Sequence, residues 1–168
     1  MKAMGYFTAA SPLMHKARDR CIISPRSEAH HEVAMLFSSE MCPCGTGQEY
    51  DACCGAFHRG LAKPKTAEQL MRSRYSAYVK SQVEYVLLTT HPAMRKHHSA
   101  EAVRTWCTTS TWKKLDILAR KKGLEKDNDG EVEFVAHYAI HGVDRTHRER
   151  SSFKRVDGIW YFYDAENS

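Results

Sequence analysis

The sequence has no long hydrophobic run. None of its 168 residues belong to a stretch approaching the roughly 18 to 20 apolar residues that a membrane-spanning helix needs. The first twenty residues also lack the unbroken apolar segment of a secretory signal, because Thr8, Ser11, Pro12 and His15 interrupt it. We therefore expect neither membrane insertion nor secretion, and we predict a cytoplasmic protein.

The sequence also carries little excess charge of either sign. Its 25 Lys and Arg residues slightly outnumber its 20 Asp and Glu residues, which gives a net charge of +5. This mild basic bias permits binding to nucleic acid without requiring it. Hydrophobic residues make up 42% of the chain, which is enough to build a core and argues against disorder over the whole length.

The six cysteines are unevenly placed. Four of them fall within the thirteen-residue segment CPCGTGQEYDACC, whereas Cys21 and Cys107 stand alone. A secreted disulfide scaffold would spread its cysteines through the chain, and the cytosol would keep them reduced. Clustering of this kind therefore favours a metal site.

The spacing C-x-C-x8-C-C predicts a structural zinc site. Its four ligands would be Cys42, Cys44, Cys53 and Cys54. Zinc takes four thiolates in a tetrahedron, and four protein ligands leave no position for water, so the ion would not be catalytic. Gly45 and Gly47 would let the backbone turn tightly enough to bring the second cysteine pair back to the ion. Two alternatives stay open: His58 could replace one of the last two cysteines, or the cysteines could be free or redox-active.

Residues 1–40 show no sustained helical or strand period, and we predict a weakly ordered N-terminal extension there. Met41 directly precedes the first cysteine of the cluster. Translation of the native protein could therefore begin at Met41, a hypothesis that N-terminal sequencing would test.

Residues 62–168 are predicted to form one α+β domain. Thr66 can cap a helix, and Gln69 completes a capping-box pattern. The apolar residues that follow recur at three- and four-residue spacing, and Arg72, Arg74 and Lys80 lie off this stripe. Further helices are expected over 84–90 and 100–107.

After Trp112 the apolar period changes from about 3.6 to 2, which is typical of strands. Turn signals fall at 127–130, 142–144 and 157–158, and Asp157-Gly158 is a strong hairpin signal. Helices followed by an antiparallel meander indicate the α+β class.

Two motifs resemble known families. CPCGTGQEYDACCG resembles the SEC-C motif, a zinc module found at the C-terminus of the SecA translocation ATPase and in many other bacterial proteins. The runs TAEQLMRSRYSAYVKSQVEYVLLTTHP and HRERSSFKRVDGIWYFYD resemble the YchJ family. The resemblance covers about residues 41–164. It implies a SEC-C module over 41–60, followed over 62–168 by a domain similar to nuclear transport factor 2, a cone of helices over a curved antiparallel sheet. It implies no activity, since none is established for the family.

Domains of this cone shape often enclose a cavity, and one predicted strand carries candidate residues for it. Alternation places His147, Glu149 and Phe153 on one face, where the first two could form an acid/base pair. Alternatively, Glu149 could pair with Arg72 or Arg74 from the first helix. The opposite face carries Arg148, Arg150 and Lys154, which could meet phosphates, with Trp160 and Phe162 nearby to stack on bases.

These observations predict a zinc-containing binding or adaptor protein that uses its SEC-C module to recognise an unidentified protein partner. Two alternatives remain. The first is a small hydrolase or isomerase that uses His147 and Glu149, and the second is association with RNA or the ribosome through the basic sheet face. The resemblance adds an expectation of homodimers formed through the sheet.

Overall fold

The computed structural model describes residues 40–167, and the extension predicted over 1–40 lies outside them except for Glu40. The elements are, in chain order, α1 (Cys54–His58), α2 (Ala67–Val79), α3 (Val83–Leu88), the 3-10 helix η1 (Arg95–His97), α4 (Ala100–Thr109), β1 (Ser110–Lys122), β2 (Asp129–Ile140), β3 (Val143–Val156) and β4 (Ile159–Asn167). No helix in this part of the chain is long and apolar enough to cross a membrane.

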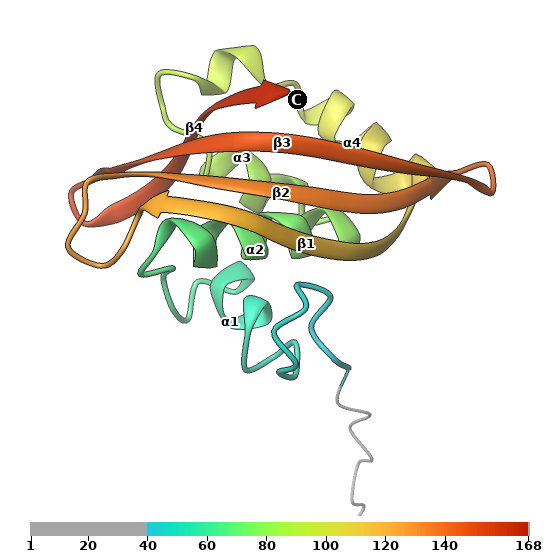
Figure 1. Ribbon diagram of the computed structural model, residues 1–168, viewed down its shortest axis with the longest axis horizontal. Helices are drawn as coiled ribbons and strands as arrows, with labels where there is room; N and C mark the ends of the chain where they lie inside the picture. Colours follow the sequence, from blue (N-terminus) through green and yellow to red (C-terminus); the bar gives the residue numbers. More distant parts are fainter. Residues whose placement is uncertain (1–39, 168) are drawn as a thin grey trace, which may run out of the picture. The chain divides into compact units, whose positions relative to one another are not determined.

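The four strands form one antiparallel meander in the order β1-β2-β3-β4. The sheet curves over the helices, with α2 beneath its concave face (Figure 1). Asp157 and Gly158 both have positive φ, 50° and 78°, as the tight turn between β3 and β4 requires. The predicted α+β class, with helices packed on a curved antiparallel sheet, is confirmed.

Two irregularities in β1 change which side chains face the helices. The pairing with β2 shifts between Trp112 and Lys114 and again between Ile117 and Ala119. Leu115 is buried, whereas Ala119, which a period of 2 would place on the same face, is exposed. A bulge adds one residue to a strand and so reverses the face of everything beyond it, which simple alternation cannot foresee.

Helix α2 lies at the centre of the fold, and its core residues belong to one cluster with side chains from all four strands. The main core cluster consists of Ala67, Leu70, Met71, Tyr75, Leu115, Val132, Phe134, Ala136, Phe153, Trp160 and Phe162. Arg74, which we expected to lie off the apolar stripe, is only 6% exposed. Prediction from an apolar stripe assumes that the opposite face of the helix is solvated. In this fold, neighbouring segments cover α2 on several sides.

The predicted start of α2 is confirmed by its hydrogen bonds. The Thr66 hydroxyl accepts a hydrogen bond from the Gln69 backbone N–H at 3.1 Å, and the Gln69 side chain accepts one from the Lys65 N–H at 2.7 Å. The side chain therefore reaches the residue before the cap rather than the cap itself. Ser99 caps α4 in the same way, through Ala102 N–H at 3.4 Å.

Replacing Thr66 by Ala should lower the free energy of unfolding by about 1 kcal/mol, because the N–H of Gln69 loses its acceptor. Urea denaturation followed by circular dichroism would measure this. Thr105→Ala, an exposed position inside α4, is the matched control. It should leave stability unchanged or raise it slightly, because alanine is the better helix former. Equal losses in both variants would contradict the capping role.

Candidate functional site

The first half of the cysteine cluster lies on a tight loop. Met41 and Glu49 pair as an isolated antiparallel bridge, and the Cys42 N–H donates to the Gln48 carbonyl at 2.8 Å. Gly45 and Gly47 have φ values of +78° and +75°, a region that favours glycine. The predicted role of these two glycines is confirmed.

The second half of the cluster lies at the start of α1. The Cys53 N–H donates to the Tyr50 carbonyl at 3.1 Å, and the Gly55 N–H donates to the same oxygen at 2.7 Å. A Cβ at position 55 would come within 2.7 Å of that oxygen, so a glycine is needed there. Tyr50 therefore fixes the point where the chain turns back towards the first cysteine pair.

The geometry of the four sulfur atoms fits a metal ion. All four Sγ atoms of Cys42, Cys44, Cys53 and Cys54 lie within 4.8 Å of one another. The Sγ atoms of Cys44 and Cys53 are 3.6 Å apart, and those of Cys53 and Cys54 are 3.9 Å apart. Thiolates at about 2.3 Å from a tetrahedral ion would be about 3.8 Å apart. No other group of three or more such ligands occurs in residues 40–167.

The electrostatics of the cluster also favour a cation. Hydrogen bonds from Cys44 and Cys54 hold the pKa of the Cys42 thiol below its usual range. The same contacts with Cys42 raise the pKa of Cys44 and Cys54. Thiols this close together resist losing all their protons, because the thiolates would repel one another. A divalent ion stabilises all four thiolates together and releases those protons.

His58 is not a fifth candidate ligand. Its Nδ1 accepts a hydrogen bond from the Tyr50 hydroxyl at 2.6 Å, and its Nε2 donates to the Ser73 carbonyl of α2 at 2.9 Å. Both ring nitrogens are therefore occupied, and His58 lies outside the group of sulfur ligands. The alternative in which His58 replaces a cysteine is wrong: the imidazole connects α1 to α2 instead.

The cysteine loop is attached to α2 through polar contacts. Arg72 donates from Nη1 to the Cys44 carbonyl at 2.6 Å, and its Nε donates to Glu68 at 2.8 Å. The Ser76 hydroxyl lies 3.6 Å from the Cys42 sulfur. One side of α2 thus carries the metal-ligating loop.

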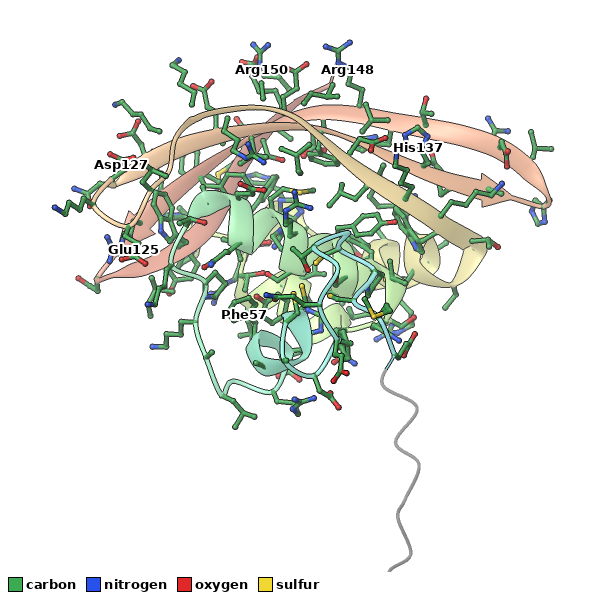
Figure 2. All side chains as sticks on the ribbon, turned by 60° about the horizontal axis from the view of Figure 1, so that its bottom comes forward. Phe57, Glu125, Asp127, His137, Arg148 and Arg150 are labelled. Atoms are coloured by element: carbon green, nitrogen blue, oxygen red, sulfur yellow. The ribbon has the colours of Figure 1, made fainter. Side chains whose placement is uncertain are left out.

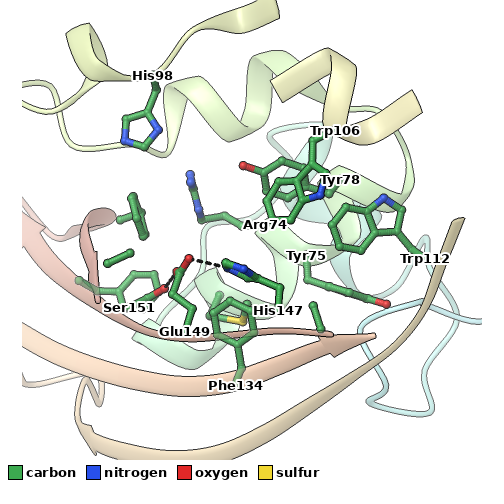
Figure 3. A pocket seen from close by; sticks show the side chains of 15 residues that line it. Arg74, Tyr75, Tyr78, His98, Trp106, Trp112, Phe134, His147, Glu149 and Ser151 are labelled. Carbon is green, nitrogen blue, oxygen red and sulfur yellow. Dashed lines mark hydrogen bonds and ion pairs between the residues drawn. The ribbon is translucent and has the colours of Figure 1, made fainter. Parts of the chain in front are cut away.

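The other side of α2 lines a cavity of about 320 Å³ beneath the sheet. Aromatic rings form much of its wall, and Figure 3 shows Tyr75, Tyr78, Trp106, Trp112 and Phe134 around the space. The rings of Trp106 and Trp112 meet edge to face at 5.1 Å between centroids. Such a concave, mostly apolar space with a few polar groups is typical of a small-molecule site.

Three polar side chains from β3 enter this cavity. His147 Nε2 lies 2.9 Å from Glu149 Oε2, and the Ser151 hydroxyl donates to the other carboxylate oxygen, Glu149 Oε1 (Figure 3). The side chains of His147 and Glu149 are 24% and 16% exposed. The predicted placement of both residues towards the cavity agrees with the structure, and neither residue is thereby assigned a reaction.

Arg74 supplies the positive charge of the cavity. Its Nη1 donates to the Val86 carbonyl at 2.6 Å and to the hydroxyls of Thr89 and Thr90 at 2.9 and 3.2 Å. The guanidinium carbon lies 4.6 Å from the centre of the Phe162 ring. Arg74 forms no ion pair with an acidic residue of the described chain, so the expected pairing with Glu149 is not observed. Arg72 pairs with Glu68 instead.

Burial changes the protonation of several groups around the cavity. It raises the pKa of Tyr75 to about 12 and also raises that of Tyr78. It lowers the pKa of His98, an effect that the nearby charge of Arg74 reinforces. His98 is therefore neutral at pH 7, and both tyrosines keep their hydroxyl protons. The cavity thus offers hydroxyl donors, a neutral imidazole and one fixed cation.

The outer face of the sheet carries the basic residues singled out for nucleic acid. Arg148 and Arg150 point away from the helices (Figure 2), but both contact the carboxylate of Glu133, at 2.6 and 3.4 Å. The rings expected to stack on bases are not on this face: Trp160 and Phe162 are 2% and 8% exposed and belong to the core. The pairing irregularity between Ser152 and Phe153 accompanies this difference.

Two residues that line the cavity, Arg74 and His98, were not predicted from the sequence to lie there. Arg74 was assigned to a polar helix face, and His98 was not singled out. Each reaches the cavity only because segments far apart in the sequence come together there. Arg74 and Val86 are separated by eleven residues, and no periodicity in the sequence indicates that they contact each other.

Comparisons with known proteins agree with this architecture. The family model described as "YchJ, middle NTF2-like domain" matches residues 66–165, and the SEC-C motif model matches residues 39–56. A UPF0225 protein of Geobacter sulfurreducens is 43% identical over 127 residues, covering 76% of this chain and 79% of the relative. A UPF0225 protein of Haemophilus influenzae is 39% identical over 133 residues, covering 79% and 81%.

Two solved structures have the same fold. The solution structure of a SEC-C motif containing protein from Rhodopseudomonas palustris matches with a TM-score of 0.70 and 35% identity, covering 77% of this chain and 99% of that one. The crystal structure of a SEC-C motif containing protein from Psychrobacter arcticus matches with a TM-score of 0.67 and 33% identity, covering 80% and 86%.

Proposed function

This chain belongs to the YchJ family, in which a SEC-C motif accompanies an NTF2-like domain, and we propose that it is a zinc-stapled protein that binds a small organic molecule in its cavity. The observation that carries the proposal is the polar group of His147, Glu149 and Ser151 inside a cavity walled by aromatic rings. Apolar walls supply affinity and a few converging polar groups supply orientation.

Zinc is the ion we propose for the cysteine cluster. Four thiolates with sulfur separations near those of a tetrahedron suit zinc. Its role is structural: when bound, it cross-links the glycine loop to the start of α1. The segment that carries these cysteines has a small hydrophobic core of its own, formed by the four cysteines and the partly buried Tyr50.

The His147–Glu149 pair would orient the ligand. In the neutral form of the imidazole, the carboxylate beside Nε2 favours the proton on that nitrogen, which leaves the lone pair on Nδ1. Nδ1 can then accept a hydrogen bond from a ligand. The rings of Trp106 and Phe134, 5.3 and 6.1 Å from the His147 ring centre, limit how the imidazole can turn.

Acid–base catalysis is a second candidate, and the same pair favours it. A histidine whose far nitrogen is bonded to a carboxylate is positioned to take a proton from a bound molecule through the other nitrogen. His147 would be the base and Glu149 its positioning residue. A hydrolase or isomerase would lose turnover in His147→Gln while still binding its substrate, whereas a binding protein would lose affinity only.

A cavity-filling variant tests the proposed binding. With indole, phenol and benzamide as probes, at least one should give saturable shifts of cavity-lining amide signals in ¹H–¹⁵N NMR spectra. Ala165→Trp, which fills the cavity from β4, should weaken that binding at least tenfold. Ala119→Trp, on the exposed part of β1, is the matched control and should leave it unchanged. Absence of saturable binding, or equal effects of both variants, would contradict the proposal.

The remaining roles stay predictions. An adaptor function would need a protein partner on the SEC-C module, and dimerisation would need the outer sheet face. That face carries charges of both signs, including the Asp116–His137 pair at 3.0 Å and the Glu133 contacts. Such mixed charge gives nucleic acid no continuous basic surface, so small-molecule binding is the function that we favour.

A further inference from the structure

We propose that the cavity selects a small ligand that carries one carboxylate, held by Arg74 and His98, with an apolar body against the aromatic wall. This inference rests on the proposed function and names the chemical class of its ligand. It starts from three features: a fixed buried guanidinium with free donors, a neutral imidazole beside it, and the engagement of the one carboxylate of the cavity, Glu149, by residues other than Arg74.

Arg74 presents one edge of its guanidinium to the cavity. Its hydrogen bonds within residues 40–167 all run from Nη1, so the N–H groups of Nε and Nη2 are without partners there. Neither atom is among the fully buried polar atoms that lack a partner, so both remain accessible, and Arg74 lines the cavity. A guanidinium edge with two free nitrogens matches the two oxygens of a carboxylate.

The position of this guanidinium is fixed before any ligand arrives. The Val86 carbonyl and the hydroxyls of Thr89 and Thr90 hold one side, and the Phe162 ring lies 4.6 Å from its centre. A preorganised donor loses little conformational freedom on binding, which favours affinity. Figure 3 shows the guanidinium directed into the space between His98 and the Glu149 carboxylate.

The charges around the cavity leave Arg74 without a close anionic partner. The other groups that face it are Glu149, the two histidines His147 and His98, and the tyrosines. Glu149 is engaged by His147 and by Ser151 rather than by Arg74. Since an unpaired buried cation is costly, an incoming anion would gain from meeting it.

His98 completes the anion subsite. Its side chain makes no hydrogen bond to another described residue, and its ring packs edge-on against Phe162 at 5.7 Å between centroids. Burial and the Arg74 charge lower the pKa of His98, so it stays neutral and offers one N–H donor. In Figure 3 it lies across the cavity from Glu149, on the side towards which Arg74 points.

Size and charge together favour a carboxylate over a phosphate. A cavity of about 320 Å³ is at the small end of the range for ligand pockets. A phosphate monoester carries between one and two negative charges at pH 7, and the cavity supplies a single fixed cation near the negative Glu149. A monoanion balances Arg74 without the additional repulsion.

The acid/amide pair benzoate and benzamide tests this inference on the full chain loaded with zinc. In isothermal titration calorimetry, the wild-type protein should bind benzoate at least tenfold more tightly than benzamide. Only the acid forms the charge-assisted pair with the guanidinium. His98→Ala should reduce the ratio of benzoate affinity to benzamide affinity several-fold. His97→Ala is the matched control, because His97 is exposed and does not line the cavity, and its ratio should equal the wild-type ratio.

Arg74→Gln should bring the benzoate-to-benzamide ratio close to one, provided that circular dichroism shows a folded chain. If that variant unfolds, the wild-type ratio and the comparison of His98→Ala with His97→Ala decide the matter. Equal binding of benzoate and benzamide to wild-type protein would overturn the carboxylate inference and leave the cavity function intact. If none of the four compounds binds (benzoate, benzamide, indole and phenol), both the carboxylate inference and the proposed cavity function are contradicted.

Discussion

Cys44→Ala should reduce the zinc content of the purified protein from one ion per chain to nearly none. Cys44 is fully buried in the cluster, and its sulfur lies 3.6 Å from that of Cys53. Three remaining thiolates would hold zinc far less tightly, and structural zinc sites contribute on the order of 10 kcal/mol to the folding of such modules. Native mass spectrometry measures the ion directly, and NMR spectra should show the loss of dispersed signals from residues 41–58.

Cys107→Ala is the matched control for this prediction. Cys107 is also buried, but it belongs to the packing between α3 and α4 and not to the sulfur cluster. The variant should keep one zinc per chain and an ordered cysteine loop. Full zinc occupancy in Cys44→Ala would show that the ion is bound elsewhere, and a metal-free wild-type protein would remove the structural-zinc proposal altogether.

Leu70→Ala should lower the free energy of unfolding by about 2 to 5 kcal/mol. Leu70 is 0% exposed and lies on α2 within the main core cluster. Truncation there would leave a cavity between α2 and the sheet, which the surrounding strands could close only in part. Chemical denaturation with urea, monitored by tryptophan fluorescence and circular dichroism together, gives the difference.

Leu61→Ala makes the same chemical change at a position that is 74% exposed. It should alter stability by no more than about 0.5 kcal/mol. The contrast between the two leucines separates burial from side-chain identity. A loss in Leu70→Ala as small as that in Leu61→Ala would mean that α2 does not pack against the sheet as described.

Features set by local sequence could be predicted. The cap at Thr66, the hairpin turn at Asp157-Gly158 and the glycine loop between the cysteines each depend on residues within a few positions of one another. The strands followed from their period of 2, and the fold class followed from the order of the elements. The cysteine cluster was visible because its four candidate ligands are close in sequence as well as in space.

Features set by tertiary contact could not be predicted. Helical periodicity assigned Arg74 to a polar face, but α2 has no single solvated side, and the guanidinium is buried against Val86 of α3 and the two threonines that follow this helix. His58 has the chemistry of a metal ligand, and only its bonds to Tyr50 and Ser73 exclude it. Ala119 follows a pairing irregularity of β1 and is exposed, and Trp160 and Phe162 lie in the core rather than beside Arg148 and Arg150.

Helix α2 connects two sites that would otherwise be separate. Arg72 and Ser76 contact the cysteine loop, while Arg74, Tyr75 and Tyr78 line the cavity, so alternating positions of one rigid element serve both. If the proposed zinc ion displaces this helix when it binds, the residues of the cavity wall move with it. By reciprocity, the factor by which zinc changes ligand affinity equals the factor by which the ligand changes zinc affinity. Loss of the proposed ion in an oxidising or metal-poor cell would then change the affinity of the cavity for its ligand. The effect would pass along less than two turns of α2.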